Sequence, residues 1–201
     1  MDIEKVKSIA KKYMERNDGA HNWDHVLRVY NLCMKIGEEE GADLEVLKLA
    51  ALLHDIGIFK DRKNHEKVSA EMAREILEDY DKKESVIHCI EAHRFSKQIK
   101  PKTLEAKILQ DADRLDVLGA IGIVRAMIYS GENNRPVYIP EKSISDTYNG
   151  ESETAIDHFY EKLLKIKDTL NTETAKKIAE HRHEFMEMFL EEFFDEWDGR
   201  R

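Results

Sequence analysis

The segment LEVLKLAALLHDIGIF at residues 44–59 constrains the fold of this chain more than any other part of its sequence. It is apolar on nearly every side until it reaches His54 and Asp55. A helix that is hydrophobic all round is normally buried in a protein core. The segment therefore predicts a central helix, buried on most sides and ending at Gly57.

The rest of the chain also shows helical periodicity, with apolar residues three and four positions apart. Only 9 Gly and 3 Pro interrupt it, which favours helices over many short strands. We therefore predict an all-α fold. The expected helices, besides 44–59, are 3–14 (broken at Asn17-Asp18-Gly19), 24–40 with Asp24 as N-cap, 68–80, 83–95, one or two helices over 103–130 bent at Gly119 or Gly122, and two more within 152–198.

A length of 201 residues suits a single domain with a substantial core. We expect one domain over 1–201, with its central part at about 20–130. Residues 131–151 (GENNRPVYIPEKSISDTYNGE) lose the helical period and predict a loop. Helices at 152–198 would then close the chain.

The formal net charge of −9 disfavours binding to nucleic-acid polymers and anionic lipid surfaces. No apolar run is long enough to span a bilayer, and the N-terminus lacks a signal-peptide pattern. Cys33 and Cys89 both lie in helical apolar patterns and suggest no disulfide framework. We expect a soluble cytoplasmic protein.

His54 and Asp55 require an explanation because ionisable side chains are rarely buried without a compensating partner. A divalent metal ion would compensate them. Two further residues complete a plausible ligand set: His25 in the run WDHVLRV, and Asp113 in the run LQDADRLD of another apolar segment. Two imidazoles and two carboxylates suit borderline or hard divalent ions better than a thiolate zinc site.

The order His…His-Asp…Asp, in the contexts WDHVLRV, AALLHDIG and DADRLDVLGAIGIVRA, resembles the HD-domain metal-dependent phosphohydrolases. Those contexts are similar to the small stand-alone HD hydrolases of bacteria and archaea, and the resemblance covers roughly residues 20–130. It implies a single-domain helical bundle of the HD type. It also implies that His25, His54, Asp55 and Asp113 are the four metal ligands.

Asp111 and Asp116 compete with Asp113 for the last ligand position. Asp113 occupies the Ala-Asp position of the family. At about 100° per residue, the other two point about 200° and 300° away around a helix, and we expect them to support the ligands instead.

His65 and His93 fall where some HD proteins place ligands of a second metal ion, and where others place groups that face substrate phosphate or water. The alternative is structural: His65 at a helix cap and His93 as a hydrogen-bonded wall residue. If both bind metal, the ligand set resembles the HD-type di-iron oxygenases.

Four basic residues are candidates for binding phosphate. Arg28 and Arg114 each lie close in sequence to a predicted ligand, and Lys60 and Lys63 follow His54 and Asp55. The alternatives are a salt bridge from each arginine to Asp111 or Asp116, and a solvated loop for the lysines.

The resemblance implies hydrolysis at phosphorus with Mn or Mg favoured, while Fe, Co, Ni and Zn are compatible. Asp55 or a neighbouring carboxylate would accept the proton of the attacking water. The favoured substrate is a nucleotide, with a nucleoside triphosphate cleaved to a monophosphate and pyrophosphate. A nucleotide-binding sensor without turnover is an alternative.

The predicted loop would be a lid over bound nucleotide, with Tyr138 and Tyr148 stacking on the base and Arg135 reaching a phosphate. A surface loop without a role is the alternative. Near the C-terminus, Phe185, Phe189, Phe193 and Trp197 repeat every four residues and suggest core or homodimer packing.

Overall fold

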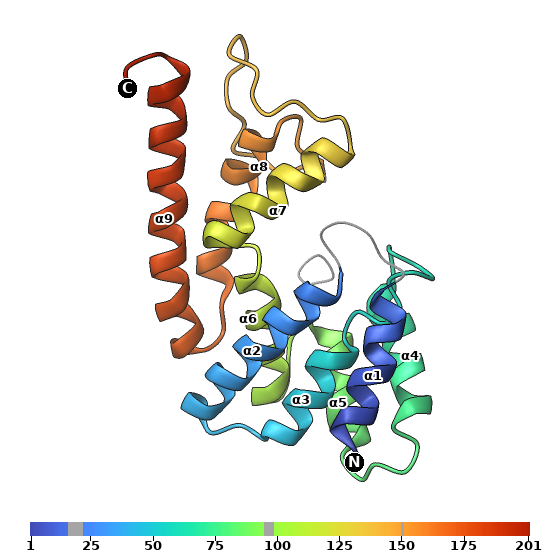
Figure 1. Cartoon of the computed structure of the whole chain (residues 1–201). Helices are drawn as coiled ribbons and strands as arrows, with labels where there is room; N and C mark the ends of the chain where they lie inside the picture. The colour runs from blue at the N-terminus through green and yellow to red at the C-terminus, as the bar shows by residue number, and fades with distance from the viewer. Residues whose placement is uncertain (16–21, 95–98, 150) are drawn as a thin grey trace. The chain divides into compact units, whose positions relative to one another are not determined.

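The computed structural model describes the whole chain except residues 16–21, 95–98 and 150. All regular structure in the described part is helical, which confirms the predicted fold class (Figure 1). The chain forms two compact units, Met1–Asp116 and Val117–Arg201, and each is described by itself. The organisation of residues 1–201 as a single domain stays a prediction.

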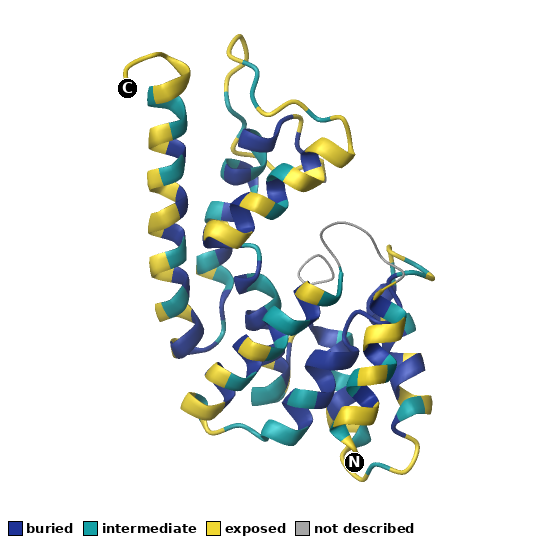
Figure 2. Cartoon of the chain, in the orientation of Figure 1, coloured by how far each residue is buried: buried dark blue, intermediate teal, exposed yellow. Residues whose placement is uncertain are grey.

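Helix α3 (Leu44–Leu53) is the centre of the first unit, where it contacts the other five helices. Seven of its ten residues are buried, and Figure 2 shows the helix mostly in the colour of buried residues. Its neighbours are α1 (Ile3–Met14), α2 (Trp23–Glu40), α4 (His65–Ile76), α5 (Lys83–Ala92) and α6 (Leu104–Leu115). The prediction of a buried central helix is therefore confirmed.

The end of this central helix differs from the prediction. Helix α3 stops at Leu53, and residues 54–60 continue as tight turns, with Ile58 N donating to Asp55 O at 3.0 Å. Gly57 is therefore not the C-cap. A Cβ on Gly57 would lie 2.6 Å from the backbone nitrogen of Ser69, so the absence of a side chain lets the turn lie against α4.

The N-cap of helix α2 lies two residues before the expected one, and the helix itself begins at Trp23. Its N-cap is Asn22, whose side chain accepts a hydrogen bond from His25 N at 3.2 Å, and Asp24 lies in the first turn. Gly41 ends the helix with a left-handed φ of 74°, as glycine commonly does. The predicted break of the first helix at Asn17-Asp18-Gly19 lies outside the described residues. The predicted fifth helix runs to Phe95, but α5 ends at Ala92 with His93 as its C-cap.

The second unit contains α7 (Gly119–Glu132), α8 (Ala155–Glu161), a 3-10 helix η2 (Leu163–Thr169) and α9 (Glu173–Trp197). Gly119 is the first residue of α7 and has a φ of +71°. The helical stretch predicted over 103–130 is therefore interrupted beside Gly119, one of the two glycines at which the sequence predicts a bend. The penultimate helix is not continuous, since α8 and η2 meet at Lys162. Phe159 is fully buried and stacks on Phe189, with ring centroids 5.9 Å apart.

The loop between α7 and α8 makes contacts inside its own unit. Tyr138 meets the ring of Trp197 edge-on at 5.3 Å between centroids. The Arg135 guanidinium pairs with Glu151 at 3.3 Å and lies 5.4 Å from the centroid of the Tyr129 ring. The predicted lid function of these loop residues stays a prediction.

Replacement of Gly57 by Ala should destabilise the protein by about 1–3 kcal/mol, because the added methyl group would overlap the backbone of α4. Urea denaturation measures the change. Gly131→Ala is the matched control, since nothing lies within 4 Å of its Cβ position on helix α7. An equal loss of stability in both variants would contradict the steric explanation.

Candidate metal centre

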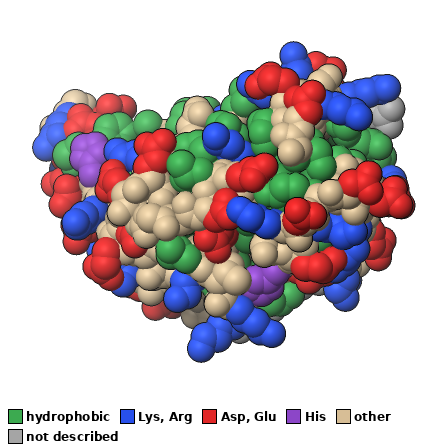
Figure 3. Space-filling model, turned by 90° about the horizontal axis from the view of Figure 1, so that it is seen from below, with side chains coloured by type: hydrophobic (Ala, Val, Ile, Leu, Met, Phe, Trp, Pro, Cys, Tyr) green, Lys and Arg blue, Asp and Glu red, His purple; other side chains and the backbone are tan. Residues whose placement is uncertain are grey.

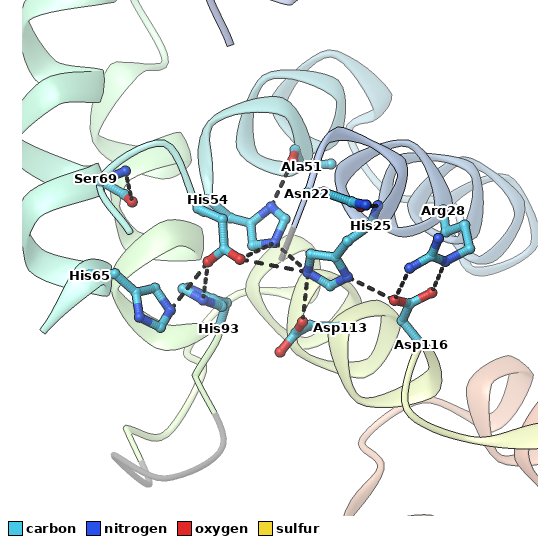
Figure 4. Close-up of polar contacts among 12 residues, drawn as sticks. Asn22, His25, Arg28, Ala51, His54, His65, Ser69, His93, Asp113 and Asp116 are labelled. Atoms are coloured by element: carbon cyan, nitrogen blue, oxygen red, sulfur yellow. Dashed lines mark hydrogen bonds and ion pairs between the residues drawn. The ribbon is translucent and has the colours of Figure 1, made fainter. Parts of the chain in front are cut away.

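Four histidine rings converge on one buried carboxylate, that of Asp55, inside the first unit (Figure 4). His25 lies in the first turn of α2, and His54 directly follows α3. His65 is the first residue of α4, and His93 directly follows α5. All five side chains are at most 8% exposed. Four helix ends, well separated in sequence, therefore build one polar site in an apolar core.

The first group of possible ligands is His25, His54 and Asp55. The Nε2 atoms of the two histidines lie 3.3 Å apart. Asp55 Oδ2 lies 3.6 Å from His25 Nε2 and 3.7 Å from His54 Nε2. Donor atoms arranged tetrahedrally about 2.1 Å from an ion are roughly 3.4 Å from one another. The three atoms therefore have the spacing of ligands to one shared ion.

The second group is Asp55, His65 and His93. It uses the other carboxylate oxygen: Asp55 Oδ1 lies 3.2 Å from His65 Nε2 and 3.5 Å from His93 Nε2. In Figure 4 these two histidines lie on one side of the cluster and His25 on the other. Asp55 thus presents one oxygen to each pair of imidazoles, as a carboxylate bridging two ions would.

Each imidazole is held through its Nδ1 atom. In His54, His65 and His93 this atom lies 2.7, 3.1 and 2.6 Å from the carbonyl oxygen of the residue three positions earlier. A carbonyl oxygen only accepts, so Nδ1 carries the proton and the Nε2 lone pair is directed at the site. Such outer hydrogen bonds orient metal-binding histidines.

His25 is held by a carboxylate instead. Its Nδ1 donates to Asp116 Oδ2 at 2.7 Å, and the Arg28 guanidinium donates to both oxygens of Asp116 at 2.6 and 3.0 Å. The structure shows the predicted salt bridge of Arg28, with Asp116 as its partner. Binding of phosphate by the same guanidinium stays a prediction. Asp116 supports His25 from behind, which makes that imidazole a stronger electron donor.

Asp113 on α6 approaches the first group, with Oδ1 3.4 Å from His25 Nε2. Burial raises the pKa of this carboxyl, but the neighbouring His25, His93 and His54 outweigh that effect and hold its pKa below the ordinary value. Its side chain is 24% exposed, so it is the solvent-facing carboxylate of the cluster. Asp111 is fully buried on the same helix.

The pKa values of the histidines follow from the same surroundings. Burial, together with His93 and His25, lowers the pKa of His54 to about 4, although Asp55 opposes the shift. His54 is therefore neutral at pH 7, which is the form that binds metal. For His93, burial lowers the pKa, but the hydrogen bond and charge of Asp55 raise it above the ordinary value.

The other predicted phosphate-binding residues do not belong to either group of possible metal ligands around Asp55. Lys60 and Lys63 are exposed, and the Lys60 ammonium lies 5.8 Å from the centroid of the Phe59 ring. Arg114 is half-buried; burial lowers its pKa, while the charges of Asp111 and Asp113 oppose the shift. Arg114 is thus within electrostatic reach of the site.

Sequence reasoning gave no role in the site to Glu66 and Arg94. The Arg94 Nη1 atom lies 3.2 Å from Glu66 Oε2, and the Glu66 side chain is 1% exposed. Their positions in the sequence could have indicated a role in the site, because each residue directly follows one histidine of the second pair, in the runs HEK and HRF.

Comparison with known proteins gives the family of this chain. The HD domain family model matches residues 22–118. The chain is 35% identical to the uncharacterized protein YpgQ of Bacillus subtilis over 201 residues, covering 93% of this chain and 89% of YpgQ. It is 32% identical to ribonuclease Y of Treponema denticola over 118 residues, which is 57% of this chain but only 22% of that enzyme.

Two solved structures are similar over nearly the whole chain. An HD-superfamily hydrolase from Bacillus thuringiensis has a TM-score of 0.77 at 36% identity, covering 98% of this chain and 96% of that one. YpgQ of Bacillus subtilis in complex with ADP has a TM-score of 0.77 at 30% identity, covering 97% of each chain.

The chain belongs to the HD domain family. Within that family it is similar to YpgQ over most of the length of both chains. Among the described residues, no helix is both long and apolar enough to cross a membrane.

Asp116→Asn should weaken metal binding by about 10- to 100-fold, because His25 would lose the carboxylate that accepts its Nδ1 proton. Competition with a chelating dye measures the affinity. Glu38→Gln removes the same charge from an exposed position of α2 and serves as the control. Unchanged affinity in Asp116→Asn would exclude this supporting role.

Proposed function

We propose that the protein is a metal-dependent phosphohydrolase acting on a small phosphorylated substrate, a nucleotide. The convergence of four Nδ1-tethered imidazoles on the buried Asp55 carboxylate carries this proposal. His25, His54, Asp55 and Asp113 would hold the principal ion. Neutral nitrogen and carboxylate oxygen ligands favour Mn or Mg and are compatible with Fe, Co, Ni and Zn.

A bound divalent ion would supply a water molecule of lowered pKa and would polarise a phosphoryl oxygen. The protein contributes the fixed positions of the ligands and an acceptor for the proton of water. Both oxygens of Asp55 face imidazoles, whereas Asp113 keeps access to solvent. Asp113 is therefore better placed than Asp55 to accept that proton.

The nucleotide class is supported by the structure of YpgQ with ADP. The favoured reaction is attack of water on the α-phosphorus of a nucleoside triphosphate. A P–O bond to water forms, the α–β anhydride bond breaks, and the products are a nucleoside monophosphate and pyrophosphate. Arg28, Arg114, Lys60 and Lys63 are the candidates for neutralising the charge on phosphate oxygens.

The expected partner is a small molecule and not a nucleic-acid polymer, although ribonuclease Y shares part of the sequence. A net charge of −9 would repel a polymer backbone. On the face shown in Figure 3, acidic and basic side chains are interspersed without a continuous basic area.

The second group of ligands favours one other function, that of an HD-type di-iron oxygenase. Asp55, His65 and His93 have the spacing for a second ion. Such an enzyme would hold two irons per chain and consume oxygen. The phosphohydrolase would instead release phosphate or pyrophosphate with any suitable divalent ion, and a sensor would bind nucleotide without turnover.

Metal-stripped protein, reloaded singly with Mn, Mg, Co, Ni or Fe, should hydrolyse members of a nucleotide panel. Pyrophosphate and orthophosphate are measured separately. His54→Ala should abolish both tight metal binding and turnover, because it removes a buried Nε2 ligand. His181→Ala, on an exposed position of α9, is the control. Full turnover by His54→Ala would overturn the proposed function.

Arg114→Ala should lower kcat/KM by about 10- to 100-fold without loss of metal, as expected when a charged hydrogen bond to phosphate worth ~1.5–3 kcal/mol is removed. Arg114→Lys should restore only part of the activity, since the planar fork is lost. Lys107→Ala, exposed on the same helix, controls for charge. Activity equal to that of the control would leave Arg114 with an electrostatic role toward Asp111 and Asp113 alone.

A further inference from the structure

The ion pair between Glu66 and Arg94 joins the two chain segments that carry the second pair of histidines. Arg94 Nη1 lies 3.2 Å from Glu66 Oε2 and also donates to the backbone carbonyl of Lys63. Glu66 follows His65 at the start of α4, and Arg94 follows His93 just beyond α5. One guanidinium thus contacts both the side chain and the backbone of the opposite segment.

The histidines themselves lack such a cross-connection in their Nδ1 hydrogen bonds. His65 is tethered to the carbonyl of Arg62 and His93 to that of Ile90, so each bond fixes a ring relative to its own segment. The distances of 3.2 and 3.5 Å to Asp55 Oδ1 depend on how the two segments are held together. The contact between Arg94 and Glu66 links these two segments to each other.

Burial distinguishes this contact from the exposed ion pairs of the same unit. The Glu66 side chain is 1% exposed and Arg94 is 24% exposed, and a desolvated carboxylate requires a compensating charge. A second pair, Arg74 with Glu91, also joins α4 to α5 at 3.2 Å, but its side chains are 42% and 41% exposed. Exposed pairs contribute little to stability. The chain therefore contains both a buried ion pair, Glu66 with Arg94, and an exposed one, Arg74 with Glu91, between α4 and the segment that contains α5 and Arg94.

We propose that Glu66 and Arg94 form a positioning pair that holds His65 and His93 against Asp55, and so controls occupancy of the second ion position independently of the first. The part that concerns the ion rests on the proposed function. The part that concerns the histidine positions does not, because it follows from the contacts of the protein alone.

The histidine positions are tested in the metal-free full-length protein by NMR of the imidazole nitrogens. Glu66→Gln and Arg94→Ala should shift the signals of His65 and His93 and leave those of His25 and His54 unchanged. Arg74→Ala and Glu91→Gln, in the exposed pair, should change none of the four. Unchanged His65 and His93 signals in folded Glu66→Gln and Arg94→Ala would overturn the positioning role.

The ion position is tested by titrating the same variants with Mn. In the wild type we expect a tight and a weaker ion. In Glu66→Gln and Arg94→Ala the weaker ion should lose about 10- to 100-fold in affinity, while the tight ion changes less than about threefold. Arg94→Lys should fall between, because lysine keeps the positive charge but is too short to place its nitrogen where Arg94 Nη1 contacts both acceptors.

The outcomes separate the two claims. A single ion in the wild type would overturn control of a second ion, while shifted His65 and His93 signals would still support the positioning role. A rise in KM for nucleotide in Arg94→Ala, with all four histidine signals unchanged, would overturn the proposal and make Arg94 a substrate ligand. Failure of turnover with every metal and nucleotide would reject the proposed function without affecting the NMR result.

Discussion

Desolvation of the Asp55 carboxylate is the constraint on which the first unit depends. A carboxylate buried in an apolar core is costly unless opposite charge or hydrogen bonding compensates it. Four imidazoles surround Asp55, two at each oxygen, and their Nε2 lone pairs face it. Lone pairs cannot compensate a carboxylate, so the cluster as a whole calls for a cation. The imidazoles come from the ends of α2, α3, α4 and α5. The site can therefore form only when α2, α4 and α5 pack around α3.

Precise placement of those rings comes from two kinds of hydrogen bond. Local bonds to carbonyls three residues earlier orient His54, His65 and His93, each of which stands at the end of a helix. Long-range contacts do the rest, through Asp116 behind His25 and through the pairing of Glu66 with Arg94. The local bonds set ring orientation, whereas the long-range contacts set the distances between segments.

The two sides of Asp55 also differ electrostatically. On the side of His54, burial and neighbouring imidazoles lower the pKa to about 4, so the ring is neutral. On the side of His93, the hydrogen bond and charge of Asp55 raise the pKa. The neutral form of His54 is the form that binds a metal ion.

The sequence by itself determined the all-helical fold, the buried central helix and the residue types of the site, because periodicity and burial of apolar side chains are local properties. It did not determine where α3 ends, since Gly57 is required by the approach of α4 and not by a helix cap. Nor did it identify Asp116 as the carboxylate that pairs with Arg28, or reveal the pairing of Glu66 with Arg94. Those contacts join residues 88 and 28 positions apart, and only the tertiary structure, which fixes how the helices lie against one another, brings them together.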